Sequence, residues 1–145
     1  MVIQTKYHGE MNLDEKEVLH FPSGIPGFLE EKKFVLVPLD HNSPFVILQS
    51  IRSADLGFVV VNPFDFTQEY EFKLSDGEKE RLQIEDNFSI SVYTILTLKE
   101  PFEESTVNLQ GPIIINENKK LAKQIILSDS TYTTKHKLFI EKTAK

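Results

Sequence analysis

The feature of this sequence that most limits its fold is a series of short apolar runs bounded by turn-forming residues. The runs are rich in Val, Ile and Phe, which is typical of buried β-strands. They follow one another at short intervals with few helical patterns between them, which favours an antiparallel meander or barrel over repeated β–α–β units. The runs are Phe34–Leu39, Phe45–Ser50, Gly57–Val61, Thr106–Leu109, Ile113–Asn116 and Leu121–Leu127.

Two longer segments also have strand patterns. Val2–Tyr7 alternates between polar and apolar residues and is followed by a second mixed stretch that reaches Val18 and Phe21. Phe88–Leu98 is the longest strand candidate, and at its start Phe88, Ile90 and Val92 share one face. Asn116–Lys119 separates the last two strands and is typical of a hairpin loop.

Helical patterns are few. One helix is predicted over Asp76–Leu82, because Ser75 can cap it and Glu78 completes a capping box three residues later. A short helical turn is predicted over Phe28–Lys33. The expected fold is therefore all-β and mainly antiparallel, a compact bent sheet or small barrel with one or two short helices.

The length of 145 residues suits one domain, and 40% hydrophobic residues are enough for a self-sufficient core. We expect a single domain over residues 1–140 and a frayed polar tail over residues 141–145. No apolar stretch is long enough to span a membrane, and the N-terminal residues lack the pattern of a signal peptide. The sequence thus predicts a cytoplasmic protein with no membrane contact.

Catalytic and metal-binding patterns are weak. Cysteine is absent, which excludes thiol chemistry and Cys-ligated metals, and no two of His8, His20, His41 and His136 have the spacing of a local metal pair. The sequence holds no nucleophile elbow and no phosphate-binding glycine loop. We expect no catalytic residue, no metal ligand and no cofactor.

Charge is unevenly distributed along the chain. The net charge is −6, but residues 1–115 carry 19 acidic and 9 basic side chains, whereas residues 116–145 carry 3 acidic and 7 basic ones. A protein that binds nucleic-acid phosphates needs the opposite overall sign. The balance argues against direct nucleic-acid binding and is compatible with a basic protein partner or with solubility alone.

The segment Phe64–Phe72 interleaves aromatic and acidic residues. If it is a strand, Phe64, Phe66, Tyr70 and Phe72 point to one face, and Asp65, Thr67, Glu69 and Glu71 point to the other. The aromatic face would lie in the core. The acidic face has two interpretations, a solvated surface or a contact with a basic protein.

The segment Phe21–Phe34 is unusual because two prolines and two glycines fix its path. Pro26 and Gly27 fit the two central positions of a type II turn. One interpretation is a corner that plugs an open end of a barrel. The other is a rigid apolar ledge for a partner, built from Ile25, Phe28 and Phe45.

Several blocks of the sequence resemble one family. F-P-x-G-I-P-G-F stands at Phe21–Phe28, S-P-F-x-x-L-Q-S at Ser43–Ser50, F-V-V-x-x-P-F at Phe58–Phe64 and V-N-L-x-G-P-I-x-x-N at Val107–Asn116. F-V-L-x-P-L at Phe34–Leu39 and A-K-Q-x-I-L at Ala122–Leu127 complete the set. In this order, over nearly the whole chain, the blocks resemble the flagellar assembly factor FliW.

The resemblance implies a non-enzymatic cytoplasmic regulator with a compact, barrel-like antiparallel fold. Members of the family bind the translational repressor CsrA, which relieves repression of flagellin mRNA, and they bind flagellin in a partner switch. The contacts are predicted here from residue chemistry: Asp65, Glu69, Glu71, Asn108 and Gln110 for CsrA, and Ile25, Phe28 and Phe45 for flagellin.

Other functional classes stay open at this point. One is a small β-barrel that binds RNA or an oligosaccharide, and another is a small hydrolase or isomerase. A monomer is expected, because no long amphipathic stripe suggests a partner helix.

Overall fold

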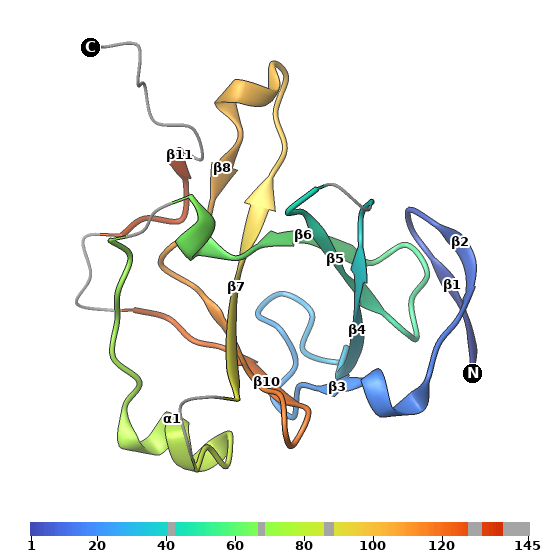
Figure 1. The fold of residues 1–145 in the computed structure, drawn as a ribbon, viewed down its shortest axis with the longest axis horizontal. Coiled ribbons are helices and arrows are strands. Elements are labelled where there is room, and N and C mark those ends of the chain that lie inside the picture. Colours follow the sequence, from blue (N-terminus) through green and yellow to red (C-terminus); the bar gives the residue numbers. More distant parts are fainter. Residues whose placement is uncertain (41–42, 67–68, 86–88, 128–131, 138–145) are drawn as a thin grey trace.

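Seven strands close into a barrel in the computed structural model of this chain, which describes residues 1–40, 43–66, 69–85, 89–127 and 132–137 (Figure 1). Around the barrel the order is β7-β6-β5-β4-β3-β10-β9, and β9 pairs again with β7. Every pair is antiparallel except β3 with β10. The seven strands are β3 (Leu19–His20), β4 (Lys33–Pro38), β5 (Val46–Ser50), β6 (Gly57–Val61), β7 (Ile90–Thr97), β9 (Ile113–Asn116) and β10 (Leu121–Gln124). The expected all-β, mainly antiparallel fold is confirmed.

The remaining elements lie outside the barrel. A separate hairpin pairs β1 (Val2–Thr5) with β2 (Gly9–Asn12), and β8 (Thr106–Val107) and β11 (His136–Lys137) extend the sheet beyond β7. Within the described residues, the one α-helix is α1 (Asp76–Arg81). The same described residues also form three short 3-10 helices, which are η1 (Glu15–Glu17), η2 (Pro63–Asp65) and η3 (Phe102–Glu104).

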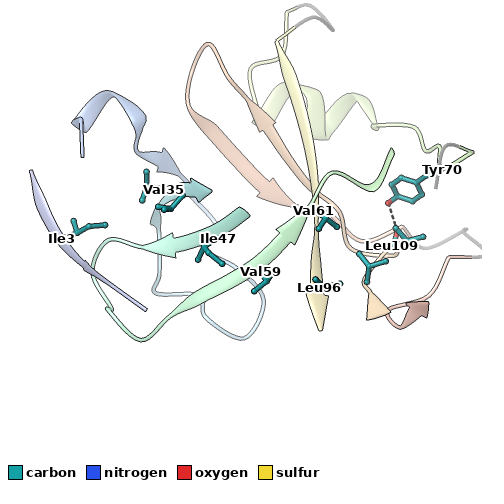
Figure 2. Packing of buried hydrophobic residues seen from close by; sticks show 10 residues of the cluster. Ile3, Val35, Ile47, Val59, Val61, Tyr70, Leu96 and Leu109 are labelled. Carbon is teal, nitrogen blue, oxygen red and sulfur yellow. Dashed lines mark hydrogen bonds between the residues drawn. The ribbon is translucent and has the colours of Figure 1, made fainter. Parts of the chain in front are cut away.

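The central strands are buried on both faces, which explains why their sequences are continuously apolar rather than alternating. Phe34, Leu48 and Val60 point into the barrel and form an inner core with residues of β9 and β10. Their chain neighbours Val35, Ile47 and Val59 point outward into a second core. Figure 2 shows this outer core, which runs from Ile3 of the N-terminal hairpin to Tyr70 and Leu109. One layer of strands therefore supports two hydrophobic cores.

The loop between β3 and β4 fills the inside of the barrel. Figure 1 shows it running across the ring of strands, and Phe21 and Ile25 are 0% and 1% exposed within the inner core. The expected Pro26–Gly27 turn is present: the Phe28 N–H donates to the Ile25 carbonyl at 2.6 Å, and Gly27 has φ +89°. A type II turn requires such a positive φ at its third position. The loop therefore plugs the barrel, as the first interpretation of this segment has it.

Helix α1 begins where the sequence predicts it. The Ser75 hydroxyl accepts from the Glu78 N–H at 3.2 Å, and the helix ends one residue earlier than expected, with Leu82 as its C-cap. The predicted capping box would use the Glu78 carboxylate to accept from the Ser75 N–H. Instead, Lys123 Nζ donates to both carboxylate oxygens of Glu78, at 2.8 and 2.9 Å. This ion pair fastens the helix to β10.

Some sequence expectations differ from the structure. The helical turn expected over Phe28–Lys33 is wrong, because a plain turn there leads directly into β4. The hairpin loop between β9 and β10 begins one residue later than the predicted Asn116, because Asn116 is the last residue of β9 and pairs with Leu121. Phe88, the domain boundary at residue 140 and the expected tail over residues 141–145 lie outside the described residues.

A buried glutamine links the N-terminal hairpin to the barrel, in addition to the packing of Ile3 in the outer core. Gln49 on β5 is fully buried, and its Oε1 accepts from the Lys6 N–H at 2.9 Å. Its Nε2 lies within 3.0–3.4 Å of four backbone carbonyls in the β5–β6 turn. Of these carbonyls, those of Leu56 and Ser53 also accept from backbone N–H groups, of Ser50 and Leu56 respectively. Gln49 therefore adds a buried side-chain link between this turn and the backbone of Lys6.

We predict that Gln49→Ala lowers the free energy of unfolding by about 2–4 kcal/mol, because it removes a fully buried side chain together with its hydrogen bonds to Lys6 and to the β5–β6 turn. Denaturant titration followed by circular dichroism measures the change. The matched control is Gln4→Ala on the exposed face of β1, with an expected change within about 0.5 kcal/mol. Equal effects of the two variants would contradict the role given to Gln49.

Candidate partner-binding site

The acidic segment after β6 is not the strand that its alternating sequence predicts. Asn62 caps a 3-10 helix instead, since its Oδ1 accepts from the Phe64 N–H at 2.9 Å and Pro63 takes the first helical position. Pro63 lacks an N–H for a strand ladder, which explains why local turn chemistry wins over the alternating pattern. Residues 67–68 lie outside the described part of the segment.

Tyr70 nevertheless anchors this segment to the barrel. Its ring is 2% exposed in the outer core, and its hydroxyl donates to the Leu109 carbonyl at 2.6 Å (Figure 2). Burial raises the pKa of the Tyr70 hydroxyl above its usual value, so the group stays a donor. The Tyr132 ring packs edge-on against Tyr70 at 4.6 Å, and the Tyr132 hydroxyl accepts from the Glu71 N–H at 3.0 Å.

These contacts bring together the two segments that the sequence analysis assigned to one partner. Leu109, which accepts from Tyr70, lies between the predicted contact residues Asn108 and Gln110. The carboxylates of Asp65, Glu69 and Glu71 belong to exposed residues, and we call these three residues the acidic surface. The acidic surface and the 108–111 turn are thus joined by a buried tyrosine rather than by a shared strand.

Asn108 shapes its turn from within. Its Oδ1 accepts from the N–H groups of Gln110 at 3.1 Å and Gly111 at 2.9 Å. A Cβ on Gly111 would lie 2.9 Å from Gln124 Nε2, so only glycine fits there without a shift. Asn108 and Gln110 are both half-buried, which leaves the acidic surface as the more accessible part of the predicted site.

The three residues predicted for an apolar ledge do not lie together. Ile25 is 1% exposed in the inner core, whereas Phe45 packs on the outer core with its ring 5.8 Å from that of Phe102. Phe28 is 43% exposed at the tip of the Pro26–Gly27 turn, and its ring rests edge-on against Phe58 at 5.5 Å.

Leu29 follows Phe28 and is 63% exposed, although the sequence analysis did not select it. The sequence signal that could have found Leu29 is its position directly after the Pro26–Gly27 turn and next to Phe28. We call Phe28 and Leu29 the apolar turn. It is the part of the predicted ledge that a partner can reach in the folded protein.

A carboxylate holds the base of the apolar turn. Glu31 accepts from the Ser53 hydroxyl at 2.6 Å and from the Ser50 hydroxyl at 2.7 Å, which fastens the end of the loop to the β5–β6 turn. These two hydrogen bonds lower the pKa of Glu31 from its ordinary value of 4.5, and the bond from Ser53 has the larger effect.

The described residues offer little for catalysis. Among them, no group of three or more His, Asp or Glu side chains is placed to hold a metal ion. No helix in this part of the chain is long and apolar enough to cross a membrane. The candidate site is therefore a pair of exposed surfaces, one acidic and one apolar, on a filled barrel.

Comparison with known proteins gives a consistent result. A family model described as FliW protein matches residues 2–138. The flagellar assembly factor FliW of Geobacillus sp. (strain WCH70) is 53% identical to this chain over 145 residues, which is 100% of both chains. The flagellar assembly factor FliW of Bacillus subtilis (strain 168) is 55% identical over 136 residues, which is 94% of this chain and 95% of the relative. A crystal structure of the flagellar assembly factor FliW superimposes with a TM-score of 0.91 at 48% identity, covering 98% of this chain and 99% of the other.

We predict that Glu31 makes stability depend on pH in the acidic range. Because its pKa is lowered in the folded state, its stabilising contribution is present above about pH 4.5 and is lost as the pH falls through the folded-state pKa. Glu31→Gln should therefore lose less stability than the unmodified protein between about pH 6 and pH 3 in denaturant titrations. Glu30→Gln is the neighbouring control and should follow the curve of the unmodified protein; a Glu31→Gln curve that also does so would contradict the assignment.

Proposed function

Because this chain belongs to the FliW family, we propose that it acts in flagellum assembly as a non-enzymatic regulator that binds CsrA and flagellin. Binding CsrA relieves repression of flagellin mRNA, and flagellin competes by occupying the regulator in a partner switch. The observation that carries the proposal is a rigidly anchored acidic surface on a chain that matches FliW relatives over its whole length. We place both interactions in the cytoplasm.

The acidic surface suits CsrA on electrostatic grounds. A protein that binds RNA presents basic side chains to the phosphates. An acidic surface on another protein is drawn toward such a region, which speeds the encounter and fixes its orientation. Once bound, the carboxylates of Asp65, Glu69 and Glu71 disfavour RNA on the repressor through their field or through a coupled shape change. Asn108 and Gln110 hold the adjacent turn in the proposed contact.

The apolar turn suits flagellin. The ends of flagellin are amphipathic helices, and such a helix binds through the apolar residues of one face. Phe28 and Leu29 present two large exposed side chains on a turn that Glu31 and Pro26 hold rigid. A rigid turn loses little conformational entropy on binding. Of the other residues considered for this partner, Phe45 is half-buried and Ile25 supports the turn from the core.

The alternative of an RNA- or oligosaccharide-binding barrel has less support. The barrel interior is occupied by Phe21, Ile25 and Phe34, each at most 1% exposed, and by the strand residues around them. Tyr70 in the outer core has the exposed residues Glu69 and Glu71 on either side in the chain, and their carboxylates repel phosphates. No observation on the described residues favours that class.

We predict that titration of CsrA into the purified protein, followed by calorimetry, gives a Kd below about 1 μM, and that prior saturation with flagellin removes the heat. Absence of heat with either partner would contradict the proposed function. Heat with CsrA that persists in the presence of flagellin would contradict the partner switch.

Charge reversal should separate the two surfaces. Glu69→Lys combined with Glu71→Lys should weaken CsrA binding roughly tenfold at low salt and leave flagellin binding intact. The matched control reverses Glu103 and Glu104 on η3, which are also exposed, and should leave both affinities unchanged. An equal loss of CsrA affinity in the control would show that binding depends only on net charge, which would contradict the assignment of the acidic surface.

The apolar turn is tested by Phe28→Ser, which should weaken flagellin binding at least about tenfold while CsrA still binds. Leu98→Ser is the matched control, because Leu98 is 51% exposed at the end of β7, away from the apolar turn. If Phe28→Ser keeps the melting temperature of the unmodified protein, the loss of flagellin binding arises from the changed surface and not from unfolding. Unchanged flagellin binding would contradict the assignment.

A further inference from the structure

A cavity of about 210 Å³ lies where the N-terminal hairpin meets the barrel, away from both surfaces described above. Its floor is apolar and comes from three separate elements: Met11 and Leu13 at the end of the hairpin, Leu19 on β3, and Val35 and Val37 on β4. The volume is below the roughly 300–1,000 Å³ of typical small-molecule sites. It is the size of one large side chain, which indicates an anchor site rather than a metabolite site.

The rim of the cavity is acidic. Asp14 caps η1, Glu17 is the last residue of η1, and both are exposed. Glu117 and Lys120 come from the turn between β9 and β10. Lys120 is the one basic residue lining this cavity, and its Nζ lies 3.4 Å from Glu117 Oε1. The carboxylates of Asp14 and Glu17 therefore have no cationic side chain of their own among the lining residues.

We propose that this cavity is an anchor site for a protein segment in which a large apolar side chain is flanked by lysine or arginine. The apolar side chain enters between Met11 and Leu13, and the flanking cations lie against Asp14 and Glu17. Buried anchors of this kind, surrounded by polar rims, carry much of the free energy of protein binding. The proposal does not depend on CsrA or flagellin, because it uses neither the acidic surface nor the apolar turn.

The chain contains a built-in probe for this site. It has two methionines, of which Met11 lines the cavity and Met1 does not. Methyl-labelled methionine therefore gives two NMR signals from the full chain. Met11 reports on the cavity lining, and Met1, whose backbone is hydrogen-bonded to Leu13, gives a comparison signal from an exposed side chain outside the lining. Three blocked tripeptides supply the ligand chemistry: Lys-Phe-Lys, Glu-Phe-Glu and Lys-Ala-Lys.

Lys-Phe-Lys should shift the Met11 signal saturably and by clearly more than the Met1 signal. Glu-Phe-Glu should bind roughly threefold to tenfold more weakly at low salt, because its charges meet carboxylates at the rim. Lys-Ala-Lys should cause no saturable shift, since it lacks the anchor. No Met11 shift with Lys-Phe-Lys, equal shifts of both methionines, or equal binding of all three peptides would overturn the proposal.

A pair of variants within η1 separates rim contacts from general charge. Glu17→Gln should reduce the preference for Lys-Phe-Lys over Glu-Phe-Glu, whereas Glu15→Gln should retain it, because Glu15 lies in the same helix but does not line the cavity. Equal effects of the two variants would show that the peptides sense only net charge, which would overturn the assignment of the rim.

Discussion

The structure depends on one constraint, which is that β4, β5 and β6 are buried on both faces. Phe34, Leu48 and Val60 pack inside the barrel, and the residues next to them pack into the outer core. Such a sheet needs a cover on each side, and the chain supplies these covers from irregular segments. The loop carrying Phe21 and Ile25 fills the interior, while the N-terminal hairpin and the segment around Tyr70 cover the outside.

Both candidate surfaces follow from those covers. A covering segment must turn part of its side chains inward, and the remainder then face solvent in a fixed orientation. Tyr70 is the inward residue of one cover, and Glu69 and Glu71 on either side of it are exposed. Ile25 is the inward residue of the other, and the same turn exposes Phe28. The groups proposed to bind partners are thus held in place by residues that complete a core, and such rigid groups lose little conformational entropy on binding.

Much of the fold could be predicted because continuous apolar runs have few structural alternatives. Gly57–Val61 and Ile113–Asn116 are strands with the bounds that the sequence indicates, and Ser75 caps α1 as expected. The site was harder to predict. Alternation within residues 64–72 correctly separates Tyr70 from Glu69 and Glu71, but Asn62 and Pro63 turn the chain into a 3-10 helix where a strand was expected. Ile25 and Phe28 are equally apolar, and only the closed turn between them determines which is buried.

The proposed function requires that CsrA and flagellin contact two different covers of one barrel. Hydrogen–deuterium exchange of the whole protein, alone and with each partner, tests this claim most directly. We expect CsrA to slow exchange in residues 69–72 and 108–111, and flagellin to slow exchange in residues 27–31, with the barrel strands unchanged in both complexes. Protection of one common segment by both partners, or protection confined to the barrel strands, would contradict the account.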